Sequence, residues 1–332
     1  MPNLRAGIIG LGTMGANHAR VLSNLDGVDL VVVADPQSEL NGFSKEISRV
    51  KSVKEVIDLG VDYCVVAAPT VNHEQIVLML IANGIHFLVE KPLADTYVSA
   101  VKVRDATKAA KVIGAVGHIE RYNSALLEAR KRIINGELGA IYQVATRRQG
   151  PLPSRISDVG VVMDLATHDI DLTSWLTGKK YIQVSANASA RSGREHEDLI
   201  SVSGLLEDSI VINHVVNWVS PLKERKIIIT GEKGTFVVDT LRADLTFYEN
   251  GKIEISRTDL AHFRGITQGE IHTFAFEKPE PLVVEHENFK GALLGGHSSI
   301  VTVEEGAYTV KIAEAIVESY VHSRTVKVLE FF

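Results

Sequence analysis

The sequence has a single cysteine among 332 residues, so it cannot form an internal disulfide bond. Cys64 lies in the apolar run YCVVAAP, where a small buried thiol is expected and a nucleophile is not. No apolar run reaches the roughly 18 residues that a membrane helix needs. The strand-like LRAGIIG begins close to the N-terminus and leaves no room for a signal peptide. These absences predict a globular, cytoplasmic protein.

An excess of positive charge is also absent, because 35 lysines and arginines face 41 acidic residues, for a net charge of −6. Such a chain has no general attraction for nucleic acid or anionic lipid, and any anionic ligand must be held locally. With 45% hydrophobic residues, the chain is long enough for two domains with a core each.

The first third of the chain alternates short apolar runs with helical patterns, the rhythm of βαβ units. The apolar runs are LRAGIIG, VDLVVVAD, VDYCVVAAP, IHFLVE and KVIGAV. The helical patterns cover residues 17–25, 52–59, 74–83 and 96–110, and Gly84 is the expected C-cap of the third. Since the apolar runs lack polar alternation, the predicted sheet is parallel and covered by helices on both faces.

The remainder of the chain has a different rhythm. Helices are predicted over 123–135 and through 161–172 as far as Gly178, with a strand over 141–148 between them. Short strands then follow one another from YIQVSANASA to DLTFYE, the pattern of an antiparallel meander. Helices over 287–294 and 304–322 close the chain, and 252–280 stays unassigned. One face of this sheet should be free, and apolar residues there would make a homo-oligomer surface, in a dimer or a tetramer.

A glycine motif follows the first predicted strand. Gly10, Gly12 and Gly15 form G-x-G-x-x-G between this strand and the next helix, and Thr13 and Met14 within the motif are also expected to bind the cofactor. This context suits a dinucleotide, whose pyrophosphate approaches the second glycine and the helix N-terminus. Asp35 ends the next strand, where a carboxylate accepts hydrogen bonds from the ribose and repels a 2′-phosphate. The sequence therefore predicts a Rossmann domain over 1–119 that binds NAD in preference to NADP.

Two further loops, APTVNHEQ and VEKPLA, each follow a predicted parallel strand, at the edge where open α/β sheets bind ligands. We expect their residues Pro69, Thr70, His73, Glu90 and Lys91 to line the cofactor crevice. Lys91 could instead pair with Glu90. For His73 the alternative is an ordinary surface residue, which is the more common place of a histidine in a first helical turn.

The stretch VVMDLATHDIDL holds several acids around one histidine. At about 100° per residue, Asp164, His168, Asp171 and Trp175 share one helical face. This row could be a metal site, an acid/base pair or the wet edge of an amphipathic helix. No third and fourth metal ligands have clear spacing, so we expect no metal. Asp169 lies elsewhere on the helix, and Asp171 could pair with a basic residue; we expect both acids to keep the helix wet.

The order of G-x-G-x-x-G, APTVNH, EKP and D-x-x-x-H resembles the Gfo/Idh/MocA oxidoreductases over essentially the whole chain. The resemblance implies a Rossmann domain followed, over 120–332, by an α/β domain with a large open, mostly antiparallel sheet for substrate binding and oligomerisation. It also implies that Lys91 is the catalytic lysine, His168 the acid/base histidine and Asp164 the aspartate that contacts substrate hydroxyls.

Two longer strings, GHIERYNSA and GPLPSRISDVGVVMDLATHDIDL, look like the branch that oxidises UDP-N-acetylglucosamine and related sugars at carbon 3. A pyrophosphate needs fixed positive charge, for which Arg155 is the predicted residue. Arg147 and Arg148 are neighbours on a strand and cannot both face a site. Glu120 and Tyr122 could reach the sugar or the base, or simply pack at the domain junction.

The predicted function is thus NAD-dependent oxidation of a secondary sugar hydroxyl, at carbon 3 of a UDP-N-acetylhexosamine, without a nucleic acid or membrane partner. An inositol or free-sugar dehydrogenase is the alternative within the same class. A non-catalytic NAD-sensing regulator is the alternative outside it, but it would not need Lys91, Asp164 and His168 together.

Overall fold

The computed structural model describes residues 2–37, 44, 46–152, 159–251 and 267–330. They form two compact units, residues 1–119 with 279–314 and residues 120–278 with 315–332. The expected boundary at residue 119 is where the chain first leaves the first unit. Residues 279–314 return to that unit, which the simple division into 1–119 and 120–332 does not include.

The first unit contains a parallel sheet of six strands in the order β3-β2-β1-β4-β5-β6. Its strands are β1 (Leu4–Ile9), β2 (Val28–Ala34), β3 (Ser48–Val50), β4 (Tyr63–Val66), β5 (His86–Glu90) and β6 (Gly114–Gly117). The order reverses between β1 and β4, which is the strand order of the Rossmann fold and its ligand-binding switch point. Neighbouring residues Val32 and Val33 point to opposite faces and are both fully buried, so the sheet is covered on both sides, as predicted.

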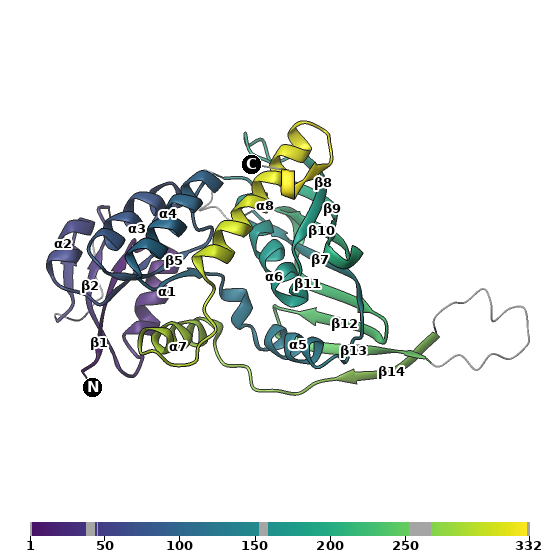
Figure 1. The fold of residues 1–332 in the computed structure, drawn as a ribbon, viewed down its shortest axis with the longest axis horizontal. Coiled ribbons are helices and arrows are strands. Elements are labelled where there is room, and N and C mark those ends of the chain that lie inside the picture. The colour runs from purple at the N-terminus through teal and green to yellow at the C-terminus, as the bar shows by residue number, and fades with distance from the viewer. Residues whose placement is uncertain (1, 38–43, 45, 153–158, 252–266, 331–332) are drawn as a thin grey trace, which may run out of the picture. The chain divides into compact units, whose positions relative to one another are not determined.

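Helices on both faces provide that cover (Figure 1). They are α1 (Thr13–Leu22), α2 (Val53–Asp58), η1 (Thr70–Asn72), α3 (His73–Ala82), α4 (Tyr97–Ala110), α7 (Pro281–Leu293) and the first part of α8 (Val303–Val321). α3 packs beside α4 on one face, and α1 packs beside α7 on the other. The Thr96 hydroxyl accepts a hydrogen bond from the Ser99 backbone N–H and so caps α4. Gly84, with a φ of +69°, ends α3 as expected.

The second unit is built on a sheet of nine strands in the order β14-β13-β12-β11-β7-β10-β9-β8-β15. They are β7 (Ile141–Pro151), β8 (Tyr181–Ser189), β9 (Leu199–Leu206), β10 (Val211–Asn217), β11 (Val219–Gly231), β12 (Gly234–Asp239), β13 (Asp244–Gly251), β14 (Thr267–Thr273) and β15 (Val326–Lys327). The sheet is mostly antiparallel, but the expected simple meander is wrong at its centre. β7 lies between β11 and β10 and pairs with β10 in parallel.

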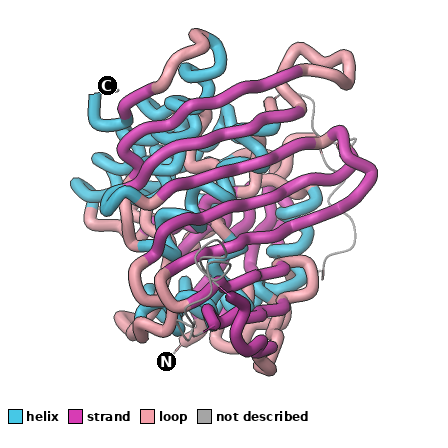
Figure 2. Tube along the Cα trace, turned by 90° about the vertical axis from the view of Figure 1, so that its right-hand side faces the viewer, coloured by secondary structure: helices cyan, strands magenta, loops and turns pink. Residues whose placement is uncertain are grey.

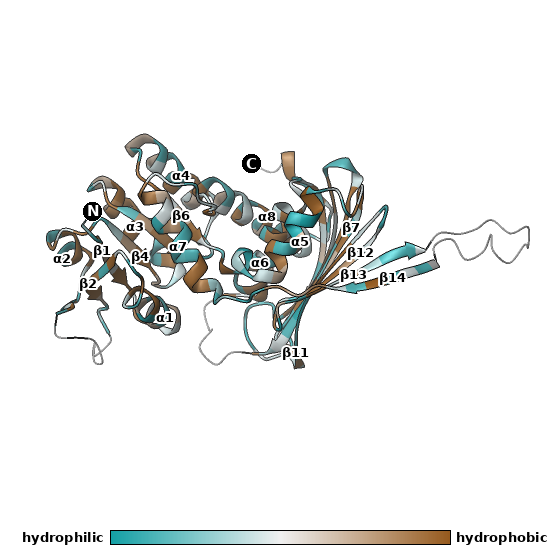
Figure 3. Cartoon of the chain, turned by 90° about the horizontal axis from the view of Figure 1, so that it is seen from below, coloured by the Kyte–Doolittle hydropathy of each residue, from teal (hydrophilic) through white to brown (hydrophobic). Residues whose placement is uncertain are grey.

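The helical elements of this unit are η2 (Ile119–Tyr122), α5 (Ser124–Ile134), η3 (Val162–Ala166), α6 (Thr167–Thr177), η4 (Glu207–Ser209), η5 (Val328–Glu330) and the last part of α8. α5 and α6 lie on one side of the sheet (Figure 3). Figure 2 looks onto its other side, which no described helix covers, in agreement with the predicted open face. Residues such as Phe236 and Val238 of β12 point to the helices and are fully buried.

No helix within the described ranges combines the length and the hydrophobicity needed to cross a membrane. Cys64 is buried in β4, where burial raises the pKa of its thiol, so the predicted inert core cysteine is confirmed.

Candidate functional site

The three glycines of the first turn have different tasks. Gly10 has a φ of +92°, and a Cβ on it would lie 2.6 Å from the Ala67 carbonyl oxygen. A Cβ on Gly15 would collide with the carbonyl oxygen of Gly10, so this glycine permits the close packing of α1 on the turn. A Cβ on Gly12 would meet no described atom within 4 Å. Packing of the protein therefore requires Gly10 and Gly15, whereas Gly12 leaves open space at the helix N-terminus.

That open space lies at the start of α1, whose first residues are Thr13 and Met14. Gly12 is the N-cap and provides no side-chain cap, and the first turn contains no acidic residue. Backbone N–H groups at such a helix end attract an anion. The turn thus fits the pyrophosphate of a dinucleotide.

Asp35 follows β2 and is fixed to the same turn. One carboxylate oxygen accepts the Leu11 N–H at 2.8 Å, and the other accepts the Gln37 N–H at 2.8 Å. A carboxylate oxygen has two acceptor sites, so these bonds are compatible with additional ones from ribose hydroxyls. The fit of Gly12 and Asp35 to a dinucleotide supports the predicted cofactor site.

The loops after β4 and β5 are joined by His73. Its Nδ1 lies 3.0 Å from the Pro92 carbonyl oxygen and its Nε2 lies 2.9 Å from that of Ala68. The side chain is buried, so the alternative of a surface histidine is wrong. Burial lowers its pKa, although the two carbonyl oxygens oppose this. His73 therefore connects the loop that contains Pro69 and Thr70 to the loop that contains Lys91.

Glu90 and Lys91 lie at the carboxyl end of β5, where Lys91 is half-buried and precedes a cis peptide bond to Pro92. The Glu90 carboxylate is buried, with Oε1 2.8 Å from His18 Nε2 and Oε2 accepting the Lys91 backbone N–H at 3.2 Å. Burial opposes its ionisation, but the hydrogen bond from His18 and the charge of Lys91 lower its pKa. The carboxylate is thus held from inside the first unit.

In the second unit, the helix predicted through 161–172 begins with a π-helical turn, η3, that contains Asp164, and continues as α6, which contains His168. A π turn has i to i+5 hydrogen bonds, so a constant 100° step does not hold across Ala166. Asp164 and His168 are both half-buried, whereas Asp171 is buried. The predicted row of Asp164, His168 and Asp171 is therefore not one wet edge.

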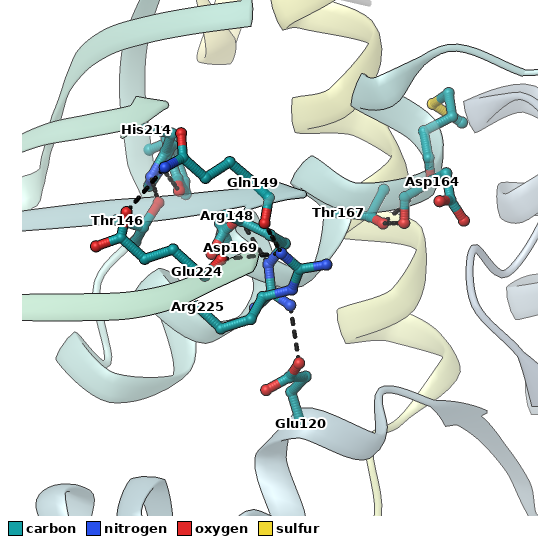
Figure 4. A network of polar contacts seen from close by, with 12 residues as sticks. Glu120, Thr146, Arg148, Gln149, Asp164, Thr167, Asp169, His214, Glu224 and Arg225 are labelled. Carbon is teal, nitrogen blue, oxygen red and sulfur yellow. Dashed lines mark hydrogen bonds and ion pairs between the residues drawn. The ribbon is translucent and has the colours of Figure 1, made fainter. Parts of the chain in front are cut away.

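The two acids after His168 are buried in ion pairs, so the expectation that they are solvated is wrong, whereas the alternative that Asp171 pairs with a basic residue is correct. Asp171 accepts hydrogen bonds from Arg121 at 2.6 and 2.8 Å. Asp169 accepts one at 3.0 Å from Nε of Arg148, whose Nη1 donates to Glu120 at 2.8 Å (Figure 4). Both pairs attach α6 to elements that precede it in the chain, Asp171 to η2 and Asp169 to β7.

Arg148 keeps its charge in this network. Burial alone would lower its pKa, but the charges of Asp169 and Glu120 outweigh that effect and raise it. Arg147, its neighbour on β7, points the other way and its side chain is 58% exposed. The prediction that the two arginines cannot share one side of the strand is confirmed.

The remaining predicted substrate residues have different surroundings. Glu120 is engaged by Arg148, and Tyr122 is buried in η2. Arg155 lies outside the described residues. Asp164 and His168 belong to no group of three close carboxylate, imidazole or thiol ligands in the described chain. Such a group does occur at Glu249, Glu270 and His272 on β13 and β14, far along the sequence from His168.

Sequence reasoning missed His18, His286 and the pairing partners Arg121 and Arg148. Each lies within an ordinary helical or strand pattern, and its partner is distant in the chain. His18 and His286, for example, are 268 positions apart and their Nδ1 and Nε2 atoms lie 2.8 Å apart. No local signal could have found such a pair.

The fold and the glycine turn together define an oxidoreductase with an NAD-binding Rossmann domain, and comparison with known families agrees. Residues 4–118 match the NAD-binding Rossmann fold of the Gfo/Idh/MocA oxidoreductase family, and residues 130–328 match its C-terminal alpha/beta domain. The chain belongs to the Gfo/Idh/MocA oxidoreductases.

Among its relatives is the scyllo-inositol 2-dehydrogenase (NAD(+)) of Bacillus subtilis, 25% identical over 96% of this chain and 94% of the relative. The UDP-N-acetylglucosamine 3-dehydrogenase of Acidithiobacillus ferrooxidans is 27% identical over 76% of this chain and 79% of its own. A solved structure with that name and source superposes with a TM-score of 0.82 at 23% identity, over 96% and 98% of the two chains. Levoglucosan dehydrogenase in complex with NADH gives 0.84 at 22% identity, over 98% and 99%.

Proposed function

We propose that the protein is an NAD-dependent dehydrogenase that oxidises a secondary hydroxyl of a sugar, at carbon 3 of a UDP-N-acetylhexosamine. The observation that carries the dehydrogenase part is the open Gly12 turn beside the fixed Asp35 carboxylate, at the switch point of a Rossmann sheet. A carboxylate at the ribose favours NAD over NADP, whose 2′-phosphate it would repel. When bound, NAD supplies the hydride acceptor.

The chain itself must remove the hydroxyl proton and stabilise the oxygen that loses it. In this proposal His168 accepts the proton, since histidine is the side chain whose ordinary pKa lies near neutrality. The Lys91 ammonium donates a hydrogen bond to the same oxygen and stabilises its developing negative charge. Asp164 orients His168 or a neighbouring hydroxyl of the sugar.

The nucleotide-sugar part is supported by the strings GHIERYNSA and GPLPSRISDVGVVMDLATHDIDL and by the relative that acts on UDP-N-acetylglucosamine. An inositol is the second candidate, because the inositol dehydrogenase of Bacillus subtilis aligns over more of this chain. The two candidates differ in charge: only a diphosphate requires a cationic partner, and the proposal gives that role to Arg155.

The test starts with purified protein. Denaturation releases any bound dinucleotide for identification, and NADH absorbance then follows turnover of UDP-sugars, inositols and aldoses. The His168→Ala variant should lose about 10²- to 10⁴-fold in rate while it still binds NADH. Wild-type turnover in that variant would refute the assignment of the base. NAD binding without turnover of any compound would favour an NAD-sensing regulator.

The substrate class is tested by Arg155→Ala, with Arg147→Ala as the matched control because Arg147 is an exposed arginine on β7. A diphosphate substrate should lose about tenfold or more in affinity in the first variant, the effect of one charge-assisted hydrogen bond. An unchanged KM for UDP-N-acetylglucosamine in Arg155→Ala would contradict the proposed pyrophosphate contact. Turnover that survives a strong chelator would support the metal-free mechanism, and loss restored by zinc would overturn it.

A further inference from the structure

Four ionisable side chains are buried together in the first unit, and the proposed reaction uses none of their side-chain atoms. They are His18 on α1, Glu90 at the end of β5, and Glu285 and His286 on α7, with exposures of 0, 8, 1 and 1%. Burial of such groups is unfavourable unless hydrogen bonds compensate for lost water. Their arrangement should therefore have a structural or catalytic reason.

Three of the four form one chain of hydrogen bonds. His286 Nε2 lies 2.8 Å from His18 Nδ1, and His18 Nε2 lies 2.8 Å from Glu90 Oε1. The ends of the chain fix its protons. A carboxylate Glu90 accepts from His18 Nε2–H, which leaves Nδ1 of a neutral His18 as the acceptor for His286 Nε2–H. Every donor in this assignment has an acceptor.

The opposite assignment is less favourable. If His18 carried both protons, His286 would have to accept at Nε2 and keep its own proton on Nδ1. That atom is buried and has no hydrogen-bond partner in the described chain. A buried donor without an acceptor is rarer in proteins than a buried acceptor without a donor. Burial also lowers the pKa of His286 well below the usual range, which favours its neutral form.

The negative charge of the cluster belongs to Glu90 and not to Glu285. Glu90 has a donor on each carboxylate oxygen, His18 on one and the Lys91 backbone N–H on the other. Neither oxygen of Glu285 has a hydrogen-bond partner among the described residues. Burial and the charge of Glu90 raise the pKa of Glu285 well above the usual range, which favours the protonated form of Glu285.

The position of the Glu90 carboxylate is defined further by Gly117 on β6. A Cβ on Gly117 would lie 3.3 Å from Cδ and Oε2 of Glu90, so a larger residue would press on the carboxylate. The carboxylate is thus enclosed by α1, β6 and the start of the loop that Lys91 opens. The opposite charge of Lys91 lowers the pKa of Glu90, so the fixed carboxylate and the Lys91 ammonium attract each other.

We propose that Glu90 is a positioning residue for Lys91, and that His18 and His286 are the buried histidines that hold its carboxylate in place. The inference rests on the proposed role of Lys91 in the reaction. It assigns to α7, which enters the unit from far along the chain, the task of orienting a side chain on β5 through His18. A positioning role predicts an effect on the chemical step and not on cofactor affinity.

Variants of the NAD-loaded full-length protein test this role, with UDP-N-acetylglucosamine and scyllo-inositol as substrates. Glu90→Gln keeps the size of the side chain and removes its charge, and His286→Leu removes the donor to His18. Each should lower kcat about 10- to 100-fold, the scale on which outer partners of metal ligands affect activity, and in His286→Leu, which lies outside the predicted cofactor crevice, the Kd for NADH should stay within about twofold. His286→Gln retains an N–H donor and should recover most of kcat.

His214→Leu is the matched control. His214 is fully buried in the second unit and bonds through both nitrogens, to Thr146 Oγ1 at 2.8 Å and to Tyr181 Oη at 3.0 Å. This control measures the general effect of losing a buried, hydrogen-bonded histidine. It should lower the melting temperature and leave kcat within a few-fold of wild type.

If Glu90→Gln and His286→Leu lose only stability, as His214→Leu does, Glu90 is merely structural and the inference is wrong. If Lys91→Ala keeps the wild-type kcat, the role of Lys91 in the proposed function is wrong. This outcome is distinguishable from a failure of the inference about Glu90. If His286→Leu does not fold, ¹⁵N NMR of the wild-type protein can test the inference by identifying the tautomers of His18 and His286. The inference expects the Nε2–H tautomer for both His18 and His286, and an Nδ1–H tautomer of His18 refutes it.

Discussion

The free energy of unfolding of the Glu285→Gln variant should rise relative to that of the wild type as the pH increases. Burial and the charge of Glu90 raise the pKa of Glu285 well above its ordinary value of 4.5. Between those two values the folded state keeps a proton that the unfolded state has lost. The free energy of unfolding of the wild type therefore falls as pH rises through this window. Glutamine is neutral at every pH and has no such dependence.

The size of the effect follows from one proton. The wild type should lose up to about 1.4 kcal/mol relative to the variant for each pH unit above 4.5, while Glu285 stays protonated in the folded state. For a folding unit of about 150 residues, this is roughly 3–6 °C in melting temperature per pH unit. Thermal unfolding of both proteins from pH 5 to pH 8 measures the difference, in which the titration of all other groups cancels.

The matched control is Glu287→Gln, on the same helix. The Glu287 side chain is 47% exposed and pairs with Lys290, so its replacement should give a small difference with little dependence on pH. A constant difference between wild type and Glu285→Gln across the pH range would show that Glu285 is ionised in the folded protein. The assignment of the cluster's single negative charge to Glu90 would then be wrong.

Three other predictions concern the cofactor turn and the buried ion pairs. Gly12→Ala should weaken NADH binding in a fluorescence titration and leave the melting temperature unchanged. Gly15→Ala should lower the melting temperature because its Cβ collides with the turn. Equal losses of stability in the two variants would contradict these separate roles of Gly12 and Gly15. Asp35→Ser should raise the ratio of NADP to NAD use in steady-state assays, and an unchanged ratio would remove Asp35 from cofactor selection. Arg148→Met leaves Asp169 buried without its partner and should cost about 3–5 kcal/mol of unfolding free energy in urea titrations. A loss below about 1 kcal/mol would mean that water reaches Asp169 in the variant.

The architecture of the first unit could be predicted because its signals are local. Apolar runs without polar alternation predicted the parallel sheet. The spacing of Gly10, Gly12 and Gly15 between a strand and a helix predicted the cofactor turn. The return of residues 279–314 could not be predicted in this way. It depends on contacts such as that between His18 and His286, which no window of sequence contains.

In the second unit, the helix around His168 shows where local reasoning stops. Its periodicity correctly predicted a helical segment that ends at Gly178. The π turn that contains Asp164 and the burial of Asp169 and Asp171 were missed. An aspartate on a helix is ordinarily solvated, and only the arrival of Arg148 from β7 and Arg121 from η2 makes its burial favourable. The place of β7 at the centre of the sheet was missed for the same reason, since strand order is decided by long-range pairing.

The first unit is built from two separate segments of the chain, which affects how it folds during biosynthesis. Residues 1–119 leave the ribosome early, but α7 and the start of α8 are made only after nearly all of the second unit. Until then the face of α1 that packs on α7 has no cover, and His18 lacks its partner His286. The nascent cofactor domain therefore cannot complete its fold until most of the second unit has been synthesised. A fragment that ends at residue 119 reproduces this intermediate, and a separately expressed cofactor domain needs residues 279–314 joined to it.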